Sequence, residues 1–167
     1  VCSSDLAFSP VIFNSIYTAE HYDARLEQSG WNLPGFAGEG WRSAMATNAP
    51  SQNITAQALH PIRNVTEIPA VEMKKQGERT WLFDFGRNMA GVTKMKVSGT
   101  KGTTIRLKHV ERLDSSGVAD MSNIDVHYRP TDDSDPFQTD IFILSGNGED
   151  EFMPRFNYQG FEYVEVT

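Results

Sequence analysis

The chain has 167 residues, of which 39% are hydrophobic and 11% aromatic, and its formal net charge at neutral pH is -7. This length suits one domain with a buried core, with room for part of a second domain. The acidic balance argues against nucleic-acid and anionic-membrane partners, because both need clustered Lys and Arg. No stretch is apolar and long enough to span a bilayer. The single cysteine, Cys2, excludes an internal disulfide.

The first 49 residues are expected to form a short irregular segment. Asp23 is placed to cap a helical turn through Ala24 to Glu27, because an Asp side chain accepts a free backbone N–H at a helix start. Residues 31–36 are typical of a loop with buried aromatic side chains, and Pro34-Gly35 is a turn signal within it.

Residues 48–77 predict a connection, because three prolines within it break any helix. Val71 and Met73 near its end indicate an edge strand. From Trp81 onwards the pattern is that of short strands joined by glycine-rich turns.

Side-chain alternation supports these strands. Trp81, Phe83 and Phe85 occupy alternate positions and therefore share one sheet face. Residues 103–110 place Ile105 and Leu107 inward, between outward-facing basic residues. Residues 141–144 form a continuous apolar run suited to a strand covered on both faces, and residues 156–166 supply the last strands. The pattern predicts an all-β fold, an antiparallel β-sandwich.

An acidic cluster at Asp132, Asp133 and Asp135 is the candidate metal site. Calcium takes several oxygen ligands, so a loop dense in carboxylates suits it. The spacing matches no complete calcium-binding loop, and a solvated loop with a turn at Asp135-Pro136 is the favoured alternative. No other cofactor is expected.

Paired carboxylates can hydrolyse a glycosidic bond when an acid and a base or nucleophile are held across it. The candidates by residue type alone are Asp84, Glu111, Asp125 and Asp140. Because the sequence places no two of them at a working separation, we predict no complete active site within the chain. The four histidines are scattered without metal-ligand spacing, which indicates structural or solvated roles.

Aromatic side chains in the first segment are a candidate sugar platform, because the apolar C–H faces of a pyranose stack on aromatic rings. These residues are Trp31, Phe36 and Trp41, and their loop-rich setting suits a binding surface. Packing inside the protein is the favoured alternative.

Several phrases occur in the order found in bacterial α-L-rhamnosidases. Residues 84–91, Asp-Phe-Gly-Arg-Asn-Met-Ala-Gly, are similar to the hallmark of the β-sandwich domain that precedes the catalytic domain, which usually has Gln where Arg87 stands. Residues 20–25 resemble the end of the family's N-terminal domain, and residues 154–166 resemble the closing phrase of the sandwich. The resemblance implies a sandwich of the jelly-roll or concanavalin-like kind.

The resemblance also implies a parent enzyme that removes terminal α-L-rhamnose from glycans or glycosides with inversion. Its catalytic acids would lie in an (α/α)6 barrel beginning after Thr167, and no catalytic residue is carried over to this chain. Residues 1–49 are then the C-terminal part of the N-terminal domain, and residues 50–167 are the β-sandwich domain. The implied partners are the intramolecular barrel and, through the parent enzyme, a carbohydrate substrate. A periplasmic or extracellular location is favoured for that parent.

Two alternatives stay open. One is a carbohydrate-binding module for rhamnose-containing glycans, calcium-dependent if the acidic cluster binds the ion. Its candidate ligands are the three aromatic residues above together with Asp125, His127 and Arg129, which lie in a stretch that departs from the commonest family form. The other is a self-contained lectin-like or scaffold protein without an enzyme parent.

Overall fold

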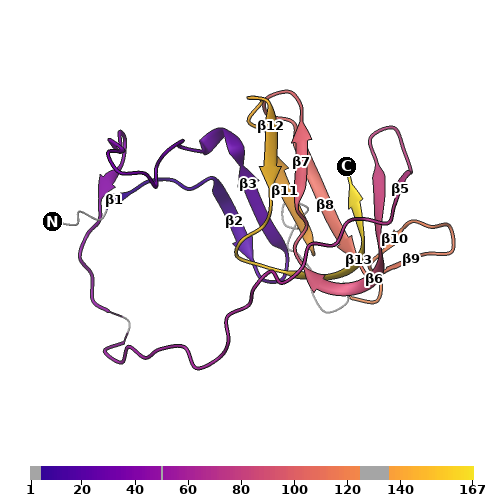
Figure 1. Cartoon of the computed structure of the whole chain (residues 1–167), viewed down its shortest axis with the longest axis horizontal. Helices are drawn as coiled ribbons and strands as arrows, with labels where there is room; N and C mark the ends of the chain where they lie inside the picture. Colours follow the sequence, from indigo (N-terminus) through magenta and orange to yellow (C-terminus); the bar gives the residue numbers. More distant parts are fainter. Residues whose placement is uncertain (1–4, 50, 125–135) are drawn as a thin grey trace. The chain divides into compact units, whose positions relative to one another are not determined.

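The structure is a computed structural model that describes residues 5–49, 51–124 and 136–167 (Figure 1). The chain divides into two compact units. We call residues up to Ser9 with Gln28–Glu67 the loop unit, and Pro10–Glu27 with Ile68–Thr167 the sheet unit. Within the described ranges, no helix combines the length and apolarity needed to cross a membrane.

The sheet unit is built on a seven-stranded sheet with the order β2-β3-β11-β8-β13-β6-β5 (Figure 1). Its strands are β2 (Val11–Ser15), β3 (Ala19–Asp23), β5 (Glu72–Lys75), β6 (Trp81–Gly91), β8 (Thr104–Val110), β11 (Thr139–Ile143) and β13 (Gln159–Val166). Among the described residues, the unit also contains two smaller antiparallel pairs: β7 (Met95–Ser98) with β12 (Glu149–Phe152), and β9 (Arg112–Leu113) with β10 (Ala119–Asp120). The predicted all-β fold is confirmed.

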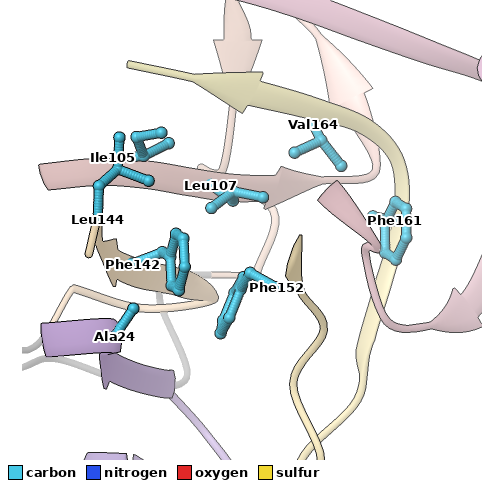
Figure 2. Packing of buried hydrophobic residues seen from close by; sticks show 8 residues of the cluster. All are labelled: Ala24, Ile105, Leu107, Phe142, Leu144, Phe152, Phe161 and Val164. Atoms are coloured by element: carbon cyan, nitrogen blue, oxygen red, sulfur yellow. The ribbon is translucent and has the colours of Figure 1, made fainter. Parts of the chain in front are cut away.

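The core lies between the large sheet and the β7–β12 pair. Figure 2 shows its buried side chains, which are Ala24, Ile105, Leu107, Phe142, Leu144, Phe152, Phe161 and Val164. The rings of Phe142 on β11 and Phe152 on β12 stack with centroids 4.8 Å apart, so they join the two layers. Met95 and Val97 of β7 pack against the same cluster. Two sheets sharing one apolar core are a β-sandwich.

Strand β8 follows the predicted alternation. Ile105 and Leu107 are buried, whereas Arg106 between them is exposed. Strand β5 lies at the edge of the sheet, as Val71 and Met73 predicted. The apolar run on β11 is less covered than expected, because Phe142 is only 1% exposed while its neighbours Ile141 and Ile143 are half-buried.

Residues 10–27 are distant in sequence from the rest of the sheet, yet they extend it by two strands. Strand β3 pairs with β11 in parallel, with His21 opposite Ile141, although every other pairing in the sheet is antiparallel. The predicted cap is confirmed, because the Asp23 side chain accepts the Arg25 N–H at 3.0 Å and begins the short 3-10 helix η1 (Ala24–Leu26). Ala24 then enters the core.

The loop unit has little regular structure, as predicted for the N-terminal segment. Its one strand pair in the described residues joins β1 (Asp5–Leu6) to β4 (Arg42–Ser43). The predicted turn at Pro34-Gly35 is present, with Gly35 at φ +87°. The expectation of buried aromatics in this loop is wrong, because Trp31 is 60% exposed and Phe36 is 37% exposed. Turns close these loops locally, and none of the described residues in the unit is buried.

Candidate functional site

One end of the large sheet carries a group of buried ionisable side chains. These are Glu20 on β3, Asp140 on β11 and His109 on β8, which we call the polar junction. His109 and Asp140 are 0% exposed and Glu20 is 1% exposed. The strands β3, β11 and β8 are neighbours in the sheet. Asp140 stands two positions before Phe142, and His109 two positions after Leu107, so both continue the face that carries the apolar core.

Hydrogen bonds from the polar junction join segments that are distant in sequence. The Glu20 N–H donates to Asp140 Oδ1 at 2.9 Å, and the Arg155 N–H donates to Glu20 Oε2 at 3.2 Å. His109 Nδ1 lies 3.1 Å from the Gln138 carbonyl oxygen. Because a carbonyl can only accept, Nδ1 carries the hydrogen. His109 Nε2 then accepts from the Thr93 hydroxyl at 2.8 Å.

Burial sets the charge state of the polar junction. It raises the pKa of Asp140 to about 7, although the hydrogen bond that Oδ1 accepts from the Glu20 N–H acts in the opposite direction. Burial also raises the pKa of Glu20 and lowers the pKa of His109 to about 4. Asp140 Oδ2 lies 3.8 Å from His109 Nε2, too far for a hydrogen bond. Burial therefore favours the protonated form of Asp140 and the neutral form of His109.

Unpaired polar atoms and unusual backbone angles gather at the same end of the sheet. Asp140 Oδ2 and both amide atoms of Asn157 are buried and have no hydrogen-bond partner among the described residues. Ala19, which precedes Glu20, and Gln138, whose carbonyl pairs with His109, have φ angles of 151° and 47°. Such features need support from their surroundings, which the buried hydrogen bonds supply here. Because its three side chains are sealed from solvent, the junction can hold strands together but cannot reach a substrate.

Two other carboxylates considered for glycoside hydrolysis, Asp84 and Glu111, have local structural contacts, and the fourth, Asp125, lies outside the described residues. Asp84 Oδ1 accepts the Gly86 N–H at 2.6 Å inside β6, where Gly86 has φ +71°. Glu111 Oε2 accepts from the Asn123 amide at 3.2 Å. Throughout the described ranges, no group of three or more His, Cys, Asp or Glu is placed to hold a metal ion.

Two of the three predicted aromatic ligands lie together in the loop unit. The rings of Phe36 and Trp41 meet edge to face with centroids 5.7 Å apart, and Trp41 Nε1 donates to Gln28 Oε1 at 2.5 Å. Trp31 makes no ring contact with either of them in the described part of the chain. The pair is thus held by its own contacts, and Trp31 presents a more open ring.

The remaining predicted ligands lie outside the described residues. They are Asp125, His127 and Arg129 of the candidate sugar site, and Asp132, Asp133 and Asp135 of the candidate calcium site. Both sites stay predictions.

The sequence did not predict that the three residues of the polar junction lie together. Asp140 was a candidate by residue type, His109 was one of several scattered histidines, and Glu20 entered only through the family resemblance. A signal was present: His109 continues the inward positions of Ile105 and Leu107 with a period of two. Their meeting depends on β3 pairing with β11, which no local pattern indicates.

Fold and site together define a β-sandwich domain whose ionisable cluster is structural. The sequence matches the model of the bacterial alpha-L-rhamnosidase concanavalin-like domain over residues 74–167, and that of the alpha-L-rhamnosidase N-terminal domain over residues 4–66. The chain belongs to the bacterial α-L-rhamnosidase family, which confirms the resemblance seen in its motifs.

This chain spans only about a sixth of the length of the relatives that it matches. It is 36% identical to an alpha-L-rhamnosidase of Streptomyces avermitilis over 162 residues, which are 96% of this chain and 15% of that protein. The solved structures of α-L-rhamnosidases from Dictyoglumus thermophilum and, in complex with L-rhamnose, from Streptomyces avermitilis both match with a TM-score of 0.83, at 34% and 36% identity. Each covers 96% of this chain, which spans 17% and 15% of theirs.

Proposed function

We propose that this chain is a non-catalytic accessory part of an α-L-rhamnosidase that hydrolyses terminal α-L-rhamnosyl residues of glycans or glycosides. One observation carries the proposal: the chain aligns along 96% of its length with the rhamnosidase of Streptomyces avermitilis but spans only 15% of it. The predicted division at residues 49 and 50, and the predicted catalytic barrel as intramolecular partner, remain parts of this proposal.

The role proposed for the sandwich is to brace the catalytic part. A brace must keep its shape under load, and two features of the sheet unit support this. Stacked rings of Phe142 and Phe152 fix one layer on the other, and the polar junction fixes β3 to β11 and to the segment that contains Arg155. Its buried carboxyls favour this structural role over acid–base catalysis, because a general acid must reach the glycosidic oxygen.

Release of nitrophenol from an aryl α-L-rhamnoside tests the proposal. The isolated chain is expected to give no release above the uncatalysed rate, at any pH between 4 and 8. The complete enzyme that contains this segment is expected to turn the substrate over. Turnover by the isolated chain at the rate of a complete enzyme would show that the catalytic groups lie within it.

A carbohydrate-binding role is a second candidate, favoured by the open Trp31 ring, 60% exposed in the loop unit. Calorimetric titration with rhamnose, with and without calcium, measures this binding. Trp31→Ala should abolish the heat, whereas Tyr158→Ala, which removes a 54% exposed ring of the sheet unit, should leave it unchanged. The absence of heat and of a thermal shift at millimolar rhamnose removes this candidate.

A further inference from the structure

Residues 44–67 of the loop unit, which we call the extended segment, combine an irregular backbone with exposed apolar side chains. Their described part, residues 44–49 and 51–67, contains no helix or strand. All five large apolar side chains are open to solvent: Met45 is 90% exposed, Ile54 93%, Leu59 80%, Ile62 79% and Val65 89%. No other stretch of similar length in the described chain leaves every large apolar residue this exposed.

The composition of the extended segment is not that of a solvated linker. Linkers that stay in water are rich in charge and poor in large apolar residues. This segment has only two residues with a full charge, Arg63 and Glu67, against five large apolar side chains. Single exposed apolar residues are ordinary on a protein surface, whereas a segment in which every large apolar residue is exposed indicates an interaction site.

Solved rhamnosidases contain a large polypeptide beyond the part that matches this chain, and this polypeptide is the candidate cover of the extended segment. Three of them match this chain with TM-scores of 0.82 to 0.83 over 96% to 97% of its residues. A match this complete includes most of the extended segment, so residues that correspond to it are present in proteins that are several times longer. This chain spans only 15% to 18% of those proteins, which leaves a large polypeptide surface available as the occupant.

We infer that the extended segment docks, as an irregular strap, into an apolar groove on the part of the rhamnosidase polypeptide that this chain lacks. Ile54, Leu59, Ile62 and Val65 are its anchors, spaced along about a dozen residues. The inference rests on the proposed function, since it takes the catalytic part as the partner. A sugar is a poorer occupant because residues 44–67 contain no Phe, Trp or Tyr on which a pyranose ring can stack.

Hydrogen–deuterium exchange tests the docking. This chain is measured alone, and again joined to the remainder of the Streptomyces avermitilis enzyme in place of the matching 162 residues. Alone, the amides of residues 51–67 should exchange at the earliest time points, whereas those of β8 and β13 stay protected. In the joined enzyme, exchange in residues 51–67 should slow at least tenfold.

A double isoleucine variant tests the proposed anchors. Ile54→Ser combined with Ile62→Ser should leave the unfolding midpoint of the isolated chain unchanged and remove the added protection in the joined enzyme. Ile16→Ser is the matched control, because Ile16 is also open, at 70% exposed, but lies in the sheet unit. It should leave the protection of the joined enzyme intact.

Three results overturn the inference. If residues 51–67 are protected from exchange in the isolated monomer, they have a structure of their own. If their protection grows with the concentration of the isolated chain, a second copy of the chain is the occupant. Unchanged exchange in a folded joined enzyme excludes docking. Rhamnosidase activity is read separately: a protected but inactive joined enzyme counts against the proposed function alone, and an active but unprotected one counts against the docking alone.

Discussion

Asp140 and His109 make opposite contributions to the pH dependence of stability, and two single substitutions should separate them. Asp140 has a pKa of about 7 in the folded chain, against an ordinary value of 3.8. Between these values the folded state holds a proton that the unfolded state has lost, so this contribution to stability falls as the pH rises. About three pKa units at ~1.4 kcal/mol each give a loss of roughly 4 kcal/mol.

His109 acts with the opposite sign. Its pKa is about 4 in the folded chain, against an ordinary value of 6.5. Here the unfolded state binds the additional proton, so this contribution rises with pH over the same window, by roughly 3 kcal/mol. Between pH 4 and 6.5 the pair therefore holds one proton in both states, on His109 when unfolded and on Asp140 when folded. The two contributions nearly cancel in the unmodified chain.

Asp140→Asn and His109→Gln remove one contribution each. We expect the stability of Asp140→Asn, relative to the unmodified chain, to rise by roughly 4 kcal/mol from pH 4 to pH 8. The relative stability of His109→Gln should fall by roughly 3 kcal/mol from pH 4 to pH 6.5. Each variant is compared with the unmodified chain because Glu20, whose pKa is also raised by burial, contributes a pH dependence of stability that is present in all three proteins.

Urea unfolding followed by tryptophan fluorescence, at half-unit steps from pH 4 to pH 8, measures these differences. Opposite slopes for the two variants support the proton transfer from His109 to Asp140 on folding. Slopes of the same sign, or an Asp140→Asn curve parallel to that of the unmodified chain, would refute the reasoning.

Three further predictions concern the fold. Phe142→Ala removes the ring stacked on Phe152 and should lower the free energy of unfolding by about 3–5 kcal/mol in urea, whereas Phe156→Ala, at a 65% exposed position, should change it by less than about 0.5 kcal/mol. A chain of residues 50–167 lacks β2 and β3 and should lose its cooperative thermal transition in circular dichroism; an unchanged transition would show that the parallel strand is dispensable. Gly146→Ala should cost more stability than Gly117→Ala: both have positive φ, but an added Cβ at Gly146 lies 2.6 Å from the facing backbone and at Gly117 meets nothing within 4 Å. Equal thermal midpoints for the two glycine variants would contradict this close approach.

Local patterns were sufficient for much of the sandwich. Ile105 and Leu107 alternate with basic residues, so the inward face of β8 follows from a period of two. Asp23 caps η1 through a contact two residues away, which a sequence can reveal directly. Ordered motifs also indicated the family, because they are local phrases that need no folded structure to be compared.

Tertiary structure decided what depends on partners distant in the chain. The parallel pairing of β3 with β11 brings Glu20 to Asp140, residues separated by 120 positions, and no periodicity encodes such a meeting. Burial at that junction then shifts the pKa values of Asp140 and His109. The type of residue alone does not determine such a shift, because it depends on the surroundings in the fold. The exposure of Trp31 has the same origin: the sequence determined an aromatic loop, but only packing decides whether a core reaches it. The sequence by itself thus determined strands, turns and family, whereas the fold decided which side chains meet and which stay open, because burial is a property of the assembled layers.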